Sequence, residues 1–153
     1  MRNLAILLFV AILSVVPAVD LVAQRGRGGE SKTIRLNKKG FLKKVADYEN
    51  SPSEWKYLGD RPAIIDFYAD WCGPCRRLSP LLDELAKEYE KEIYIYKVNV
   101  DSDKEIAEAF GITSLPTIVF VPLKGTPSAG VGFLPKDVLK KAVDEILLNK
   151  KPE

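Results

Sequence analysis

Histidine is absent from the 153-residue sequence, and there are only two cysteines, Cys72 and Cys75. Without imidazole, Ser-His-Asp catalysis, Cys-His catalysis and histidine-ligated zinc are excluded, and two cysteines cannot form a four-thiolate metal site. The net charge is only +2, so the chain also lacks the broad basic field that holds nucleic-acid phosphates. We therefore expect no metal, no cofactor beyond the thiol pair itself, and no nucleic-acid partner.

The longest apolar run follows the basic start Met1-Arg2-Asn3 and covers residues 4–16, interrupted only by Ser14. This arrangement predicts a signal peptide over residues 1–23. As a helix the run would extend about 20 Å, which is short for a hydrocarbon core of about 30 Å. Cleavage is expected after Ala18 or, preferably, after Ala23, and an uncleaved anchor that includes residues up to Ala23 is the alternative.

Residues 24–32 are rich in glycine and charge, so we expect a flexible lead-in there. The chain as a whole is 46% hydrophobic and 29% charged, which is typical of a folded globular protein, and its length suits one domain. We place that domain at residues 33–150.

Hydrophobic periodicity within this domain alternates between strand and helix patterns. Strands are predicted over residues 33–36, 63–69, 93–100, 117–121 and 128–133. Helices are predicted over residues 38–48, 72–89, 103–110 and 135–148, and residues 50–61 are interpreted as a packed loop. The inward-facing residues of the last helix are expected to be Val138, Leu139, Ala142, Val143, Ile146 and Leu147.

The strand, helix and strand between residues 63 and 100 predict a parallel unit with a right-handed crossover. The two later strands are joined by a turn at Lys124-Gly125, which is short enough for an antiparallel hairpin. Together they indicate an α/β fold.

The two cysteines form a Cys-x-x-Cys pair, a spacing that haem attachment, metal sites and redox centres share. Haem attachment needs histidine at residue 76, which is arginine, and zinc needs two further ligands. A redox dithiol and an inert structural disulfide remain. We favour the redox interpretation, because closing so small a loop restricts the unfolded chain little.

The pair lies where a strand leads into a helix, with Cys72 at the N-cap and Cys75 in the first turn. Unpaired N–H groups and the positive end of the helix dipole favour the Cys72 thiolate. Cys72 is therefore expected to attack a substrate disulfide, and Cys75, expected to be less exposed, to resolve the mixed disulfide.

The segment Ile64-Ile65-Asp66-Phe67-Tyr68-Ala69-Asp70-Trp71-Cys72-Gly73-Pro74-Cys75 resembles the active-site segment of the thioredoxin family. The resemblance continues, in family order, through Pro80, Lys97-Val98-Asn99-Val100-Asp101, Phe110-Gly111-Ile112, Leu115-Pro116-Thr117 and Val131-Gly132. It implies a thioredoxin fold, which is a mixed central β-sheet flanked by helices in three α/β/α layers.

Asp66 is unusual in an otherwise apolar strand. Burying a carboxylate is costly unless the group is neutral, is paired with a positive charge, or takes part in the reaction. The resemblance implies that Asp66 moves protons to and from Cys75 and that Lys97 tunes it. A purely structural pair with Lys97 is the alternative.

The resemblance also implies a cis-proline turn at Leu115-Pro116, opposite the cysteines. Together with this turn, the residues expected to form a shallow apolar substrate groove around Cys72 are Trp71, Pro74, Val131 and Gly132. Two departures from the family bear on substrate preference: Tyr68 where many members have tryptophan, and Ser114 where many have glycine.

We therefore expect a periplasmic or secreted, monomeric protein-disulfide reductase that cycles between Cys72/Cys75 dithiol and disulfide. The Gly-Pro pair between the cysteines resembles reducing members of the family. Its expected partners are protein disulfides and a thiol-donating reductase, which could be membrane-bound. The alternatives are a disulfide oxidase or isomerase, since extracytoplasmic environments are oxidising, and a non-enzymatic redox-dependent chaperone or binding module.

Overall fold

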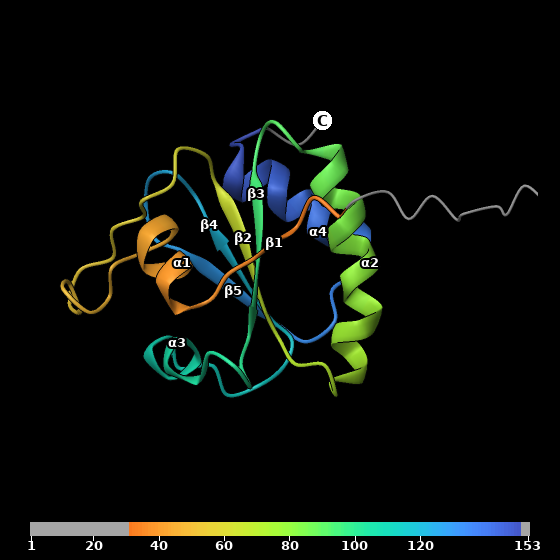
Figure 1. Ribbon diagram of the computed structural model, residues 1–153. Helices are drawn as coiled ribbons and strands as arrows, with labels where there is room; N and C mark the ends of the chain where they lie inside the picture. Colours follow the sequence, from red (N-terminus) through yellow and green to blue (C-terminus); the bar gives the residue numbers. More distant parts are fainter. Residues whose placement is uncertain (1–30, 151–153) are drawn as a thin grey trace, which may run out of the picture.

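The computed structural model describes residues 31–150 (Figure 1). The predicted signal peptide or anchor at residues 1–23, and most of the predicted lead-in at 24–32, lie outside the described residues. Between residues 31 and 150, none of the helices combines the length and the hydropathy that a membrane crossing requires.

The described residues contain one five-stranded sheet with the order β1-β3-β2-β4-β5. Its strands are β1 (Ile34–Arg35), β2 (Ala63–Tyr68), β3 (Tyr94–Asn99), β4 (Thr117–Val121) and β5 (Ser128–Val131). Strands β1, β3 and β2 are parallel to one another, whereas β4 is antiparallel to both β2 and β5. The predicted mixed sheet and the predicted hairpin are therefore both confirmed.

Helices cover both faces of the sheet, α1 and α3 on one side and α2 and α4 on the other (Figure 1). The helices are α1 (Lys38–Lys44), α2 (Gly73–Glu88), α3 (Lys104–Ala109) and α4 (Lys136–Ala142), which continues into the π-helical turn η1 (Val143–Leu147). This arrangement is the predicted three-layer α/β/α architecture.

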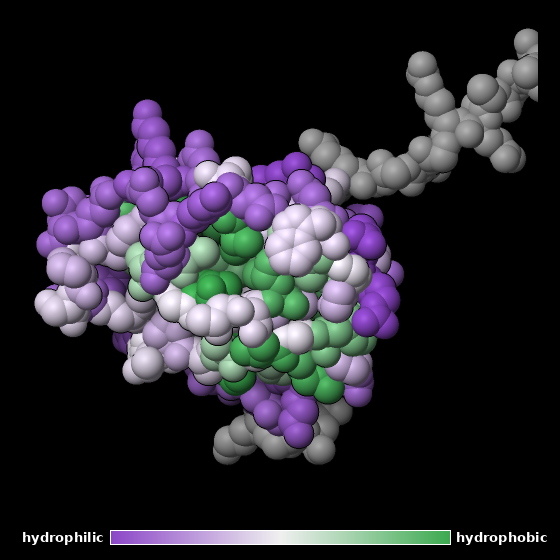
Figure 2. Space-filling model, turned by 90° about the horizontal axis from the view of Figure 1, so that it is seen from below, coloured by the Kyte–Doolittle hydropathy of each residue, from purple (hydrophilic) through white to green (hydrophobic). Residues whose placement is uncertain are grey.

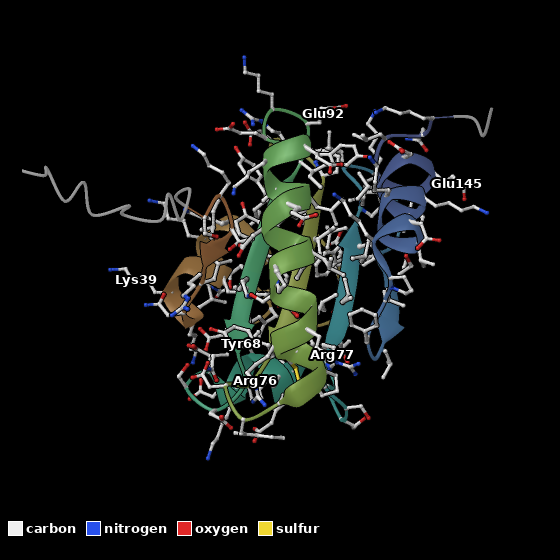
Figure 3. All side chains as sticks on the ribbon, turned by 90° about the vertical axis from the view of Figure 1, so that its right-hand side faces the viewer. Lys39, Tyr68, Arg76, Arg77, Glu92 and Glu145 are labelled. Atoms are coloured by element: carbon white, nitrogen blue, oxygen red, sulfur yellow. A yellow bond between two sulfur atoms is a disulfide. The ribbon has the colours of Figure 1, made fainter. Side chains whose placement is uncertain are left out.

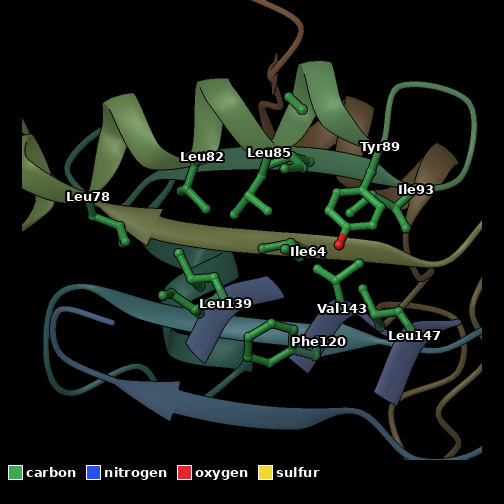
Figure 4. Close-up of a cluster of buried hydrophobic side chains, with 13 residues drawn as sticks. Ile64, Leu78, Leu82, Leu85, Tyr89, Ile93, Phe120, Leu139, Val143 and Leu147 are labelled. Carbon is green, nitrogen blue, oxygen red and sulfur yellow. The ribbon is translucent and has the colours of Figure 1, made fainter. Parts of the chain in front are cut away.

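The central strand β2 is buried along its whole length, and its alternate residues face opposite layers. Ile64 packs with the side chains of α2 and α4 in the core cluster shown in Figure 4. Ile65 and Phe67 belong to the second cluster, with α1 and α3. The alternation therefore places Asp66 on the α2 side of the sheet, level with Lys97 of β3.

Two helix predictions need correction at their ends. The first helix ends at Lys44 rather than near residue 48, because the Val45 carbonyl accepts a hydrogen bond from the Leu58 amide of the following loop (2.9 Å) and so leaves the helical pattern.

The last helix buries fewer residues than its sequence pattern predicts. Leu139, Val143 and Leu147 are buried, but Val138 and Ile146 are 44% and 36% exposed. A π-helical turn holds more residues per turn than an α-helical one. It keeps Leu147 in line with Val143 and rotates Ile146 outward, while Val138 lies at the edge of the buried stripe.

Candidate active site

The cysteine pair lies at the start of α2, where the chain leaves β2. Cys72 is the N-cap of the helix, and its Sγ accepts a hydrogen bond from the Cys75 amide (3.2 Å). The two residues form a disulfide, with their Cα atoms 5.3 Å apart, visible as a yellow bond at the lower end of α2 in Figure 3. Both cysteines are 4% exposed, so the expected difference in their exposure is absent in the disulfide form.

The local sequence favours this turn. The Cys72 amide donates to the Ala69 carbonyl (3.1 Å), which turns the chain out of the strand. Pro74 then occupies the first turn of the helix, where its fixed φ suits helix geometry and its missing N–H costs no hydrogen bond. The free N–H groups of this first turn consequently point toward Cys72.

The two cysteines line different hollows. Cys72 lines an open, mainly apolar groove of about 430 Å³. The other residues of this groove are Trp71, Gly73, Pro74, Val100, Ile112, Thr113, Ser114 and Leu115. Cys75 lines a smaller cavity of about 160 Å³ together with Lys97 and Ser79. The two sulfurs therefore lie in different surroundings: an open, mainly apolar groove at Cys72 and a small cavity lined by Lys97 and other charged side chains at Cys75.

The apolar groove lies at the end of the molecule that Figure 2 shows, where apolar side chains gather inside a hydrophilic border. Trp71 is 69% exposed, and its indole N–H donates to Asp101 Oδ2 (2.9 Å). This bond fixes the ring at the rim of the groove, next to the disulfide.

The turn before β4 contains a cis peptide bond between Leu115 and Pro116. Of these two residues only Leu115 lines the groove. Val131, the last residue of β5, and Gly132 after it lie outside the lining of this groove. They remain connected to the turn: the Gly132 amide donates to the Pro116 carbonyl (2.8 Å), and Val131 is 64% exposed.

Asp66 and Lys97 form a buried ion pair, with Oδ2 and Nζ 3.5 Å apart. Burial raises the pKa of Asp66 to about 6, and the positive charge of Lys97 opposes this rise. Neither carboxylate oxygen has a hydrogen-bond partner among residues 31–150. A carboxyl group with this pKa changes its protonation close to neutral pH, as a proton donor and acceptor must.

Sequence reasoning missed several residues of the site. Ser79 accepts a hydrogen bond from Lys97 Nζ (2.7 Å), and its position one helical turn after Cys75 was the available signal. Ile112 and Thr113 lie in an irregular segment, and no periodicity marks them as groove residues. Within residues 31–150 no three His, Cys, Asp or Glu side chains are grouped closely enough to hold a metal ion.

Comparison with known proteins gives the same family throughout. The thioredoxin family model matches residues 33–145. The thioredoxin of Borreliella burgdorferi is 49% identical over 112 residues, which are 73% of this chain and 95% of that protein. The chloroplastic M-type thioredoxin of Pisum sativum is 39% identical over 98 residues, 62% of this chain and 57% of its own longer chain.

A solved structure, that of chloroplastic thioredoxin z, superposes with a TM-score of 0.63 at 27% identity. The match covers 74% of this chain and 93% of that one. The family match, the fold and the bonded cysteine pair at the start of α2 agree: the chain belongs to the thioredoxin family and is a thiol-disulfide oxidoreductase.

Proposed function

We propose that the protein reduces disulfide bonds of client proteins outside the cytoplasm, using Cys72 and Cys75 as its dithiol. One observation carries the proposal: Cys72 caps α2 and lines the open groove, whereas Cys75 lines the small cavity that Lys97 shares. The attacking and resolving sulfurs therefore have the surroundings that their steps require.

In the first step, the Cys72 thiolate attacks one sulfur of the client disulfide. A mixed disulfide forms between Cys72 and the client, and the second client sulfur leaves as a thiolate that takes up a proton. The free N–H groups at the start of α2 support this step, because they stabilise the attacking thiolate.

In the second step, Cys75 loses its proton and attacks Cys72 Sγ. The bond between Cys72 and the client breaks, the client sulfur that was bound to Cys72 leaves as a thiolate and takes up a proton, and the Cys72–Cys75 disulfide forms. Two electrons have then moved from the protein to the client. We assign Asp66, whose partner Lys97 lines the same cavity as Cys75, as the acceptor of the Cys75 proton, and Lys97 as the charge that tunes Asp66.

The groove supports broad recognition of clients. Its apolar wall includes Trp71, Pro74 and Leu115, and an extended client segment can lie along the Leu115-Pro116 turn and bind partly through main-chain groups. Val131 and Gly132, which adjoin this turn through the bond to Pro116, would border the bound segment.

The Cys72–Cys75 disulfide must be reduced again after each cycle. We propose that a thiol-donating reductase reduces it. Because the clients lie outside the cytoplasm, we propose that this reductase is membrane-bound. The N-terminal sequence supports this location, and the protein would act there as a monomer in the periplasm or after secretion.

Insulin reduction by dithiothreitol tests the activity. The wild type should accelerate precipitation of the insulin B chain, Cys72→Ser should abolish the acceleration, and Cys75→Ser should accumulate mixed disulfides through Cys72. Full activity of Cys72→Ser would overturn the proposal and favour a non-enzymatic chaperone that uses the same groove.

The predicted leader also supports a second candidate, a disulfide oxidase or isomerase, because extracytoplasmic compartments are oxidising. The reduction potential separates the two. A reductase should have a potential more negative than that of the glutathione couple, and a more positive value would favour the oxidase.

A further inference from the structure

The Lys97 ammonium lies among three groups that the strands and α2 bring together. It donates to Ser79 Oγ at 2.7 Å, it lies 3.5 Å from Asp66 Oδ2, and it stands 4.9 Å from the centre of the Tyr68 ring. Lys97 is 7% exposed, so few other partners are available to it. The shortest of these contacts goes to a neutral hydroxyl and not to the carboxylate.

The Asp66 carboxylate is left without a hydrogen bond although a buried ammonium is its neighbour. A charge-assisted N–H···O bond normally measures about 2.7–2.9 Å, well below the 3.5 Å observed here. Such a bond stabilises the ionised carboxyl group, so its absence keeps the neutral form of Asp66 accessible.

Ser79 is the group that competes for the ammonium. It lies four residues after Cys75, on the same face of α2, and both residues line the cavity of about 160 Å³. The hydrogen bond to Ser79 thus directs the ammonium toward the cavity that Cys75 also lines.

We propose that Ser79 is a positioning residue, whose hydroxyl holds the Lys97 ammonium on the α2 side of the cavity and so prevents a direct hydrogen bond between Lys97 and Asp66. Only the consequence of this inference, the transfer of a proton between Asp66 and Cys75, rests on the proposed function. The placement of the Lys97 ammonium by Ser79 does not depend on that function.

Other charged groups lie around Lys97. Those that line the hollows on either side of Lys97 are Arg35 of β1, Asp70 after β2, Arg76 of α2, Lys44 of α1 and Asp103 before α3. The Tyr68 hydroxyl group belongs to the same surroundings, and Cys75 is bonded to Cys72 in the oxidised protein. All of them stay in place when Ser79 alone is changed.

The test is an NMR titration of the Asp66 carboxyl carbon in the oxidised protein, compared among wild type, Ser79→Ala and Ser79→Thr. Without the hydroxyl, the ammonium should turn to the carboxylate. The Ser79→Ala midpoint should then fall by half a pH unit or more, about a threefold rise in the dissociation constant. Ser79→Thr keeps the hydroxyl and should titrate like wild type.

An unchanged midpoint in folded Ser79→Ala would overturn the proposal, as would an equal shift in Ser79→Thr. The titration needs neither client nor reductant, so it reports on Ser79 even if the wild type fails to reduce insulin. Conversely, normal insulin reduction by wild type with no shift in Ser79→Ala would remove the role of Ser79 and leave the proposed function intact. The pH profile of insulin reduction should move with the midpoint.

Discussion

Asp66 is a buried carboxyl group whose ionisation lowers the stability of the folded chain. Asp66 is 1% exposed and has no hydrogen-bond partner among residues 31–150. Its pKa of about 6 in the folded protein lies above the ordinary 3.8. The folded chain therefore binds this proton more tightly than the unfolded chain, and the free energy of unfolding decreases as the pH rises from about 4 to above 6.

Asp66→Asn should remove this pH dependence. At pH 8 we expect the oxidised variant to be more stable than wild type, with an upper limit of about 3 kcal/mol from the pKa difference. The gain is smaller than the limit because Lys97 loses its charged neighbour. Toward pH 4, where wild-type Asp66 is neutral, the gain should vanish.

Urea unfolding at several pH values measures this effect, and Glu108→Gln, which changes an exposed carboxyl group of α3, is the matched control. The control should leave the pH dependence unchanged. An Asp66→Asn variant that is no more stable than wild type at pH 8, or equally stabilised at pH 4, would contradict the assignment of a raised pKa.

At the scale of single residues, the sequence was sufficient to select Cys72, Cys75 and Asp66. The cysteines stand out by spacing, and the aspartate stands out by its charge in an apolar strand. The contact between Lys97 and Ser79 could not be predicted in the same way, since it depends on how closely α2 approaches β3 in the folded chain.

Helix α2 connects the site to the core. Its first turn carries the cysteines, and the rest of its inner face fills the cluster in Figure 4 with buried leucines. Leu82 is fully buried, whereas its neighbour Leu81 is only partly buried. The inner face therefore holds the position of the cysteines by packing.

Leu82→Ala should lower the free energy of unfolding by about 2–5 kcal/mol, because it leaves a cavity between α2 and the sheet. Leu81→Ala, on the same helix and with the same atoms removed, should have a distinctly smaller effect. Denaturant unfolding of the oxidised proteins provides the comparison, and equal losses in the two variants would contradict the packing described here.

Helices and strands were predicted well where a single hydrophobic pattern extends over the whole element. β2, β3 and α2 have strong patterns and clear end signals, and their predicted ranges agree with the structure to within a few residues. The final helix changes to a π-helical turn at Val143, and a pattern based on 3.6 residues per turn therefore misplaced Ile146.

In the whole molecule, the crossover from β2 through α2 to β3 brings the parts of the site together. β2 supplies Asp66, β3 supplies Lys97, and α2 begins with Cys72 at the end of the sheet that carries the apolar groove (Figures 1 and 2). The fold class could be predicted from the order of elements, and the family from the active-site segment. The groove lining could be predicted only in part: Trp71, Pro74 and Leu115 follow from the family resemblance. Ile112 and Thr113 do not, because they approach Cys72 only in three dimensions.

We expect the start of α2 to favour the Cys72 thiolate at neutral pH. The most direct test follows the rate of iodoacetamide alkylation against pH in Cys75→Ser, where Cys72 is the only cysteine, with Cys72→Ser as the control for Cys75. An unstructured cysteine is about 3% ionised at pH 7. We predict that Cys72 is ionised more than tenfold above that level; an alkylation profile that coincides with that of an unstructured cysteine peptide would contradict the account.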